Sequence, residues 1–273
     1  MLKALLKKQL SEIFRGYFYD SKKNKARSKG AVIAYFTLFV VLMVGVLGGM
    51  FAFLAFALCA PLTQAGAGWL YFTILGLLAV FLGVFGSVFN TYAGLYLAKD
   101  NDLLLSMPIP VRVIMLARLL GVYLMGLLYS GVVMVPALIV YFAVAPFRPA
   151  ALFGAIWLSF LISVFVLTLS VALGYVVAKI SLKLKNKSFI TVLVSLLFFA
   201  GYYFLYFKAQ ALITKLVENI GQYSEKIRGA AYPLYLFGRT GEGDPIAVLA
   251  VSAVILGLFA LVWVLISRSF LKI

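Results

Sequence analysis

The sequence predicts an all-α integral membrane protein. Hydrophobic residues make up 65% of the 273 positions, mean hydropathy is +1.10 and only 12% of residues are charged. A soluble domain is about half apolar and about a quarter charged, so this composition excludes one. The basic residues that give a formal net charge of +16 lie in loops between apolar runs. No basic domain is present that would hold a duplex, and we therefore expect no nucleic-acid partner.

Six apolar segments are expected to cross the bilayer, because roughly 20 helical residues span a hydrocarbon core of about 30 Å. The predicted spans are 31–60, 67–97, 113–145, 150–180, 188–207 and 246–267. The chain is then a single transmembrane domain, 1–273, with spans one to five within 31–207. The basic leader before span one is too long for an ordinary secretory signal, so we expect span one to remain in the mature protein.

The distribution of lysine and arginine predicts the orientation. Of the 24 lysines and arginines, nine precede span one, three lie at 98–118, four lie at 179–187 and two follow span six. The alternate loops hold six, and five of these belong to one long loop, where the positive-inside rule has little force. We expect a multi-pass protein of the cell membrane with both termini in the cytosol.

Residues 1–30 are expected to form a cytosolic elbow: an amphipathic helix followed by a solvated basic turn. Apolar residues recur at three- and four-residue spacing, which predicts one apolar face. Leu6, Leu10 and Phe14 would enter the lipid boundary, while Lys7 and Arg15 would face anionic headgroups. The alternative is a plain positive-inside signal with no further role.

The stretch 99–112, Lys-Asp-Asn-Asp-Leu-Leu-Leu-Ser-Met-Pro-Ile-Pro-Val-Arg, is a charged, proline-marked break between two spans. Its two prolines cannot continue a helix, because proline lacks the N–H and clashes with the preceding turn. We expect a short rigid element on which a soluble partner docks. The expected docking residues are Asp100, Asp102, Leu103, Leu104, Leu105, Met107, Pro108, Ile109, Pro110 and Arg112. The alternative is that the two carboxylates only cap a short helix.

The residues within the spans argue against ion-coupled transport and catalysis. The chain has no histidine, and no Asp or Glu lies in a span interior, where a coupling ion would need one. No Gly-Lys pair occurs, so the chain has no phosphate loop of its own. With one cysteine, Cys59 in an apolar run, neither a metal cluster nor a nucleophile with a histidine base can be assembled. We expect no catalytic, cofactor or metal residues.

Polar and small residues in the spans have structural interpretations. The hydroxyls of Ser159, Ser163, Thr168 and Ser170 are expected to bond to carbonyls of their own helix, and the alternative is that they line a pathway. Pro136 is expected to kink span three.

Residues 208–245 are the one sizeable external segment. Apolar residues from Leu212 to Tyr223 at helical spacing predict an amphipathic helix. A second apolar stretch, 232–237, follows it and leads into a segment with three glycines. This order predicts a re-entrant or interfacial helical hairpin before span six. A partly ordered surface loop is the alternative.

The whole pattern resembles the permease of a type-2 ABC exporter. The likeness rests on the elbow, six spans with both termini inside, helical material before the last span, and Asp100 to Pro110 with Arg112 and Arg118 after it. The resemblance implies that the elbow and a coupling helix at 100–110 contact a separate cytosolic ATPase, which binds the ATP. It also implies a second six-span unit, as a homodimer, a heterodimer or a fused half.

The expected function is therefore that of a transport subunit without an ATPase site, which moves substrate outward when the ATPase closes. One alternative is a non-catalytic membrane scaffold or assembly subunit. A less favoured one is a magnesium-dependent lipid enzyme that uses Asp100 and Asp102.

Overall fold

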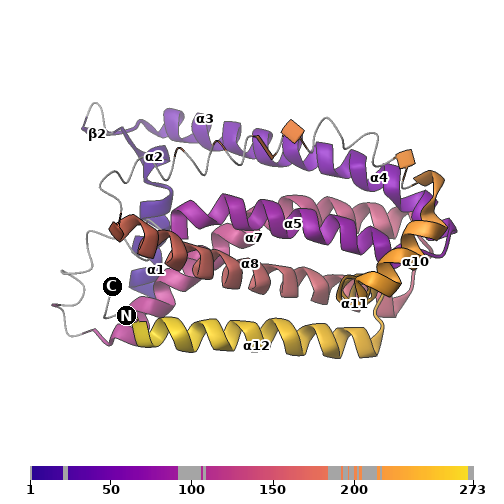
Figure 1. Ribbon diagram of the computed structural model, residues 1–273. Helices are drawn as coiled ribbons and strands as arrows, with labels where there is room; N and C mark the ends of the chain where they lie inside the picture. The colour runs from indigo at the N-terminus through magenta and orange to yellow at the C-terminus, as the bar shows by residue number, and fades with distance from the viewer. Residues whose placement is uncertain are drawn as a thin grey trace.

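The computed structural model describes residues 2–20, 24–91, 106, 109–183, 192, 196, 200–201, 203–204, 214–215 and 217–269. These residues are almost all helical, apart from one antiparallel pair of two-residue strands. The elements in chain order are α1 Leu2–Ile13, α2 Arg15–Phe18, β1 Tyr19–Asp20, β2 Lys25–Ala26, α3 Lys29–Val40, η1 Val41–Gly48, α4 Gly49–Gln64, α5 Gly68–Thr91, α7 Val111–Val144, α8 Pro149–Lys183, α10 Ile220–Ala230, α11 Tyr232–Gly241 and α12 Pro245–Ser269 (Figure 1).

Among the described residues, five helices are long and apolar enough to span a membrane. They cover Lys29–Gln64, Gly68–Val88, Val113–Val144, Pro149–Lys179 and Pro245–Leu265. A multi-pass helical membrane protein is thus confirmed, and these five helices coincide with predicted spans one, two, three, four and six. Predicted span five, 188–207, lies outside the described residues except for isolated positions.

Span one is a single long helix interrupted by a π-helical segment. It runs through α3, η1 and α4 without leaving helical geometry, and η1 covers Val41–Gly48. The segment contains Gly45 and ends at Gly48, whose position approaches Pro136 of α7. A π segment of this length within a membrane helix is uncommon, since π geometry mostly appears as single turns.

Helix α5 forms the centre of the bundle, where it packs against α4, α7, α8 and α11. In its most apolar 18-residue stretch 61% of residues are buried. Tyr71 is fully buried there, and its hydroxyl donates a 2.6 Å hydrogen bond to the carbonyl of Ala137 on α7. The rings of Phe72 and Tyr141 pack beside it, with centroids 5.5 and 5.6 Å from the Tyr71 ring. This aromatic cluster joins spans two and three.

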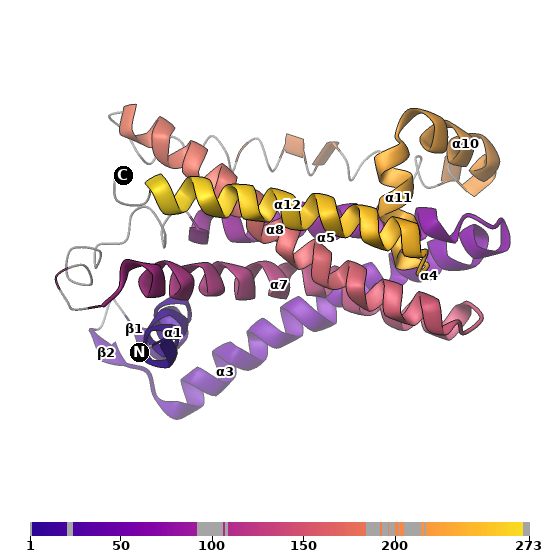
Figure 2. The ribbon, with the colours of Figure 1, turned by 90° about the horizontal axis from the view of Figure 1, so that it is seen from below.

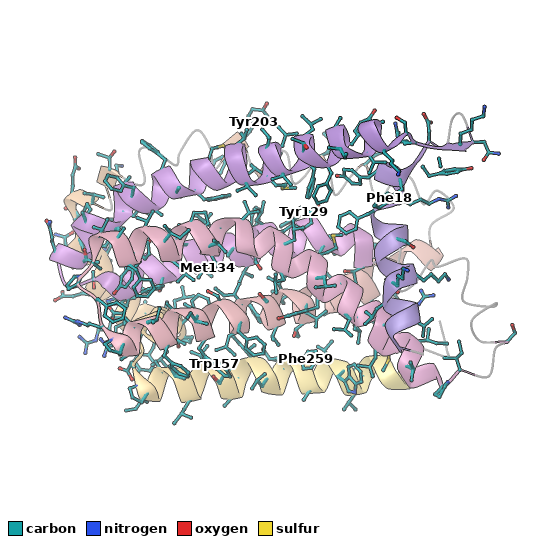
Figure 3. All side chains as sticks on the ribbon, turned by 180° about the vertical axis from the view of Figure 1, so that it is seen from behind. Phe18, Tyr129, Met134, Trp157, Tyr203 and Phe259 are labelled. Atoms are coloured by element: carbon teal, nitrogen blue, oxygen red, sulfur yellow. The ribbon has the colours of Figure 1, made fainter. Side chains whose placement is uncertain are left out.

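Hydroxyl groups mostly bond within their own helix, as the sequence predicted. Ser159, Ser163 and Thr168 each donate to the carbonyl four residues earlier, at 2.8 to 3.0 Å. Ser170 differs, because its Oγ lies 2.6 Å from the Oγ of Ser87 and so joins α8 to α5. In the same way Trp157 Nε1 donates to Ser252 Oγ at 2.8 Å and joins α8 to α12. Figure 3 shows Trp157 and Phe259 where α8 and α12 face each other.

Spans one and six lie at the outside of this bundle. Only 11% of residues in the most apolar stretch of each are buried, against 61% for α5 and 56% for α8. Large apolar side chains therefore face outward from both, including Phe53 on α4 and Leu249 on α12. Lipid is the environment in which such surfaces are stable, because it is as apolar as the side chains themselves.

The two ends of the bundle carry different elements. Helix α1, the end of α5, the start of α7 and the end of α12 lie at one end (Figure 1). Helices α10 and α11 and the turn between α4 and α5 lie at the other end, and the perpendicular view agrees (Figure 2). We call these the elbow end and the hairpin end.

Candidate functional site

The predicted docking residues fall mostly outside the part of the chain that the structure describes. This holds for Asp100, Asp102, Leu103, Leu104, Leu105, Met107 and Pro108. Of the others, Ile109 is half-buried, and Pro110 is exposed at the start of α7, where its carbonyl accepts from Val113 at 2.8 Å. Arg112 lies in the first turn of α7. The flanks of the element thus lie at the elbow end, and its docking role stays a prediction.

The elbow residues form two helices where the sequence pattern predicted one. Helix α1 ends at Ile13, and α2 begins at Arg15 after a break at Phe14. Leu6 and Phe14 are half-buried, whereas Lys7 and Arg15 are exposed, as an amphipathic helix requires. Leu10 lies in α1, but its side chain is outside the described set.

The elbow packs against α7 as well as facing outward. The side chain of Gln9 lies against Gly121, and a Cβ at position 121 would come within 3.0 Å of Gln9 Cγ. The Tyr17 ring contacts Phe39 of α3 edge-on, with centroids 5.8 Å apart. The elbow is therefore fixed to the starts of spans one and three, so a force on it would reach both.

At the hairpin end, α11 is inserted among α5, α8 and α12. The insertion needs glycine: a Cβ at Gly238 would clash with the Trp69 carbonyl, and one at Gly243 with the Ala150 carbonyl. Gly243 also has φ +82°, which glycine adopts without strain. Thr73 of α5 donates to the Leu234 carbonyl at 3.1 Å.

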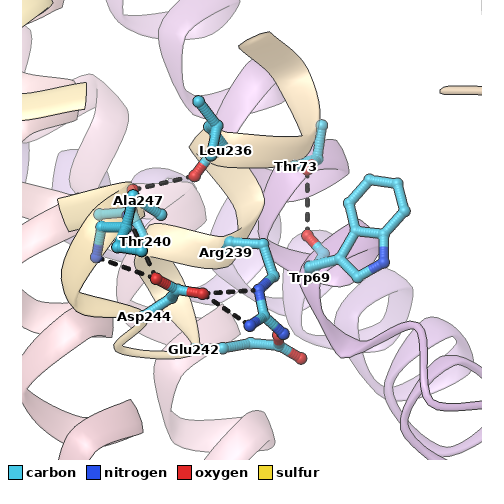
Figure 4. Close-up of polar contacts among 9 residues, drawn as sticks. Trp69, Thr73, Leu236, Arg239, Thr240, Glu242, Asp244 and Ala247 are labelled. Atoms are coloured by element: carbon cyan, nitrogen blue, oxygen red, sulfur yellow. Dashed lines mark hydrogen bonds and ion pairs between the residues drawn. The ribbon is translucent and has the colours of Figure 1, made fainter. Parts of the chain in front are cut away.

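Arg239 joins two carboxylates at the end of α11 (Figure 4). Its Nη2 and Nε donate to Asp244 Oδ2 at 2.6 and 3.2 Å, and its Nη1 lies 3.2 Å from Glu242 Oε2. Asp244 Oδ1 also accepts from the backbone N–H groups of Ile246 and Ala247, at 3.0 and 3.3 Å, and so caps α12. One guanidinium thus ties the hairpin to the start of span six.

The two carboxylates have opposite electrostatic environments. Burial raises the pKa of Glu242 above its ordinary value, although Arg239 and the backbone N–H of Trp69 oppose the shift. Hydrogen bonds from Arg239 lower the pKa of Asp244 below its ordinary value. Glu242 also lies against the start of α5, where a Cβ at Gly68 would come within 2.7 Å of its Oε1, so the cluster contacts span two as well.

These three side chains are a positioning cluster, because they cap and join helix ends and their polar atoms are engaged with one another. No group of three His, Cys, Asp or Glu residues within the described ranges is arranged to hold a metal ion. The sequence pattern did not predict this cluster. One signal was present: Asp244 directly precedes Pro245, the order typical of a helix N-cap followed by proline at the first helical position.

The comparisons with known proteins yield no relative: the chain matches no protein-family model, no curated protein and no solved structure.

Proposed function

We propose that this chain is the membrane-spanning permease of an ATP-driven exporter of the type-2 ABC kind. One observation carries the proposal: the two specialised elements occupy opposite ends of one helical bundle. The elbow, the end of α5 and the start of α7 lie at one end, and the last two of these flank 92–110. The α10–α11 hairpin lies at the other end. An exporter needs this polarity, because the driving subunit and the exit of the substrate are on opposite sides of the membrane.

In this proposal the elbow end faces the cytosol, and residues 100–110 form the coupling helix. A cytosolic ABC ATPase docks there and on the elbow, and it binds the ATP. Because α1 packs on α7 beside Gly121 and Tyr17 contacts Phe39 of α3, ATPase closure would move spans one and three together. The hairpin faces outward, and its close packing against α5, α8 and α12 suits a cover over the exit of the path.

A second six-span unit completes the permease, as the resemblance implies. Five described spans pack into one bundle around α5, whose core is filled by aromatic and branched side chains. The described spans therefore enclose no wide path for a lipid, peptide or saccharide among themselves. Two units that enclose the path between them would supply it.

Partner capture tests the proposal. Tagged chain extracted from membranes in a mild detergent should retain a cytosolic protein with an ABC ATPase domain, and the complex should hydrolyse ATP. Capture of membrane proteins alone would favour the scaffold alternative. Lipid modification by the purified chain without a partner would favour the enzyme alternative. Either result would contradict the permease proposal.

Variants in the coupling element sharpen this test. Leu104→Ala with Met107→Ala, or Asp102→Arg, should weaken ATPase association about 30-fold or more, because truncating a central anchor costs about 2 kcal/mol. Glu225→Arg on α10 reverses a charge at the hairpin end and serves as the control. If the two carboxylates only cap a helix, the Asp102 variant would instead lose expression and thermal stability while the folded fraction binds normally.

A further inference from the structure

The junction between the elbow and span one is a folded surface with an excess of positive charge. The β1–β2 pair joins Tyr19 to Ala26 and Asp20 to Lys25 in antiparallel register. Its continuation into span one is fixed by a 2.9 Å hydrogen bond from Arg27 N to the Phe18 carbonyl. The Ser28 side chain then caps α3 by accepting from Ala31 N. The described part of the basic run, 24–29, thus has a defined conformation here.

Two of its arginines are held on aromatic rings. The Arg15 guanidinium lies 5.3 Å from the centre of the Tyr19 ring, and that of Arg27 lies 4.5 Å from the centre of the Tyr35 ring. Stacking of this kind orients a guanidinium without neutralising it. The positions of these two guanidinium charges are therefore set before any ligand arrives.

Among the described residues, the cations of this surface outnumber the carboxylates beside them. Asp20 Oδ2 lies 4.0 Å from Arg27 Nη1, well beyond the roughly 2.7–2.9 Å of a strong charge-assisted hydrogen bond. Within the described residues, Arg27 Nε is the buried side-chain nitrogen that has no hydrogen-bond partner. Arg15, Lys25 and Lys29 are exposed. In the described part of this surface, one carboxylate thus accompanies four cations.

The hairpin end shows the contrast. Near α10, the cations Lys215, Lys226 and Arg228 are accompanied by Glu218 and Glu225. At the end of α11, Arg239 is compensated by Glu242 and Asp244. Unbalanced positive charge among the described residues therefore gathers at the elbow junction.

We propose that the surface formed by Arg15, Lys25, Arg27 and Lys29, which we call the basic junction, binds the headgroup of an anionic phospholipid. Charge complementarity selects the headgroup, because cations beside a span are attracted to anionic lipid. Apolar surface next to it selects a lipid over a soluble anion. Phe18, Ile33 and Phe36 are each more than half exposed, and they lie where the acyl chains of a lipid bound at the junction would run.

The site also has the right depth in the membrane. Span one begins at Lys29, three residues after the end of β2, so the junction lies within about 10 Å of the apolar stretch. The proposal depends only on membrane insertion of α3 and stands apart from the transport proposal.

The experiment is a lipid titration of purified chain in mixed micelles, followed by the thermal unfolding midpoint. Phosphatidylglycerol should raise the midpoint of the wild type, and phosphatidylcholine should not. Lys25→Gln with Lys29→Gln should weaken the apparent affinity for phosphatidylglycerol on the order of 30-fold, because each cation near the surface contributes about a factor of five. Lys226→Gln with Arg228→Gln removes the same charge from the hairpin end and should leave the affinity unchanged.

Further arms make the result decisive. Lys25→Arg with Lys29→Arg keeps the charge and should retain the response, which separates headgroup binding from damage to the fold. Inorganic phosphate at the same concentration should produce no shift; an equal shift with phosphate would overturn lipid as the ligand. Undiminished phosphatidylglycerol affinity in the double glutamine variant, or an equal loss in the hairpin-end control, would overturn the site itself.

Discussion

At the scale of single residues, Asp244 performs two functions with different atoms. Its Oδ1 caps α12, and its Oδ2 receives the Arg239 guanidinium. A cap needs only an acceptor oxygen, whereas the ion pair needs the charge. Asparagine therefore separates the two, because it keeps the acceptor and removes the charge.

We predict a graded loss of stability at this position. Asp244→Asn should cost about 0.5–1 kcal/mol, since both partners of the ion pair are partly exposed to solvent. Asp244→Ala should cost about 1 kcal/mol more, because the cap is lost as well. Thermal unfolding in detergent at pH 7 measures both. Equal unfolding midpoints for the two variants would show that Asp244 does not contribute separately through the cap and through the ion pair.

The pH dependence of the Asp244→Asn difference has a defined sign. The pKa of Asp244 is lower in the folded protein than its ordinary value of 3.8. The ionised group therefore stabilises the fold above pH 3.8, and this contribution is lost as the pH falls through the lower, folded value. Wild type and Asp244→Asn should converge in that acid range. Glu242 is present in both proteins, so its opposite shift does not create the difference.

Tyr71 is the buried polar side chain that fixes span two to span three. Tyr71→Phe removes the 2.6 Å bond to the Ala137 carbonyl and leaves the ring packing in place. We predict a loss of about 1 kcal/mol, the usual net contribution of one hydrogen bond. Tyr223→Phe on exposed α10 is the matched control and should be neutral. The unfolding midpoint decides, and equal effects at both positions would show that the interhelical bond contributes nothing.

At the scale of elements, the elbow is held by its contacts with α7 and α3. Amphipathic burial alone would let α1 lie anywhere along the bilayer surface. The Gln9–Gly121 contact and the Tyr17–Phe39 contact instead fix it against two spans. This is the property expected of an element that transmits force.

We predict that Gly121→Leu displaces the elbow. A leucine side chain at this position would meet Gln9, whose Cγ is already 3.0 Å from a Cβ there. Gly131→Leu on the same helix is the matched control, because a Cβ at Gly131 meets nothing within 4 Å. Hydrogen–deuterium exchange of the peptide 2–18 should rise in the first variant and stay at the wild-type level in the second. Equal exchange in both would show that the contact does not hold the elbow.

At the scale of the whole molecule, a topology measurement can test which end of the bundle faces the cytosol. Ser106 and Gln222 are both exposed. Ser106 precedes α7, which begins at the elbow end, by five residues, and Gln222 lies on α10 at the hairpin end. The positive-inside rule predicts that the elbow end, and Ser106 with it, faces the cytosol.

We predict the labelling pattern of single cysteines in a Cys59→Ser background. A membrane-impermeant thiol reagent applied to intact cells should modify Gln222→Cys and spare Ser106→Cys. Permeabilised cells, in which both should react, provide the control. The reverse pattern would invert the topology and remove the cytosolic docking surface from the proposed mechanism.

The sequence by itself determined the helical membrane class and the approximate limits of five described spans. Composition and uninterrupted apolar runs are sufficient for this, because the bilayer sets the length and polarity of any helix that crosses it. The hydrogen bonds from the hydroxyls of Ser159, Ser163 and Thr168 to backbone carbonyls were also predictable, since these carbonyls lie one turn away on the same helix.

Contacts between distant parts of the chain were decided only by the tertiary structure. Nothing local distinguishes Ser170, which bonds to Ser87, from Thr168, which bonds to its own helix. The order of the spans around α5, the break of the elbow at Phe14 and the contact of Gln9 with Gly121 are likewise absent from any sequence periodicity. Lipid is as apolar as the protein interior, so apolar side chains are stable on every face of a membrane helix. Hydropathy therefore cannot distinguish the face that packs inside the bundle from the face that contacts lipid. Close packing and a few interhelical hydrogen bonds make that choice.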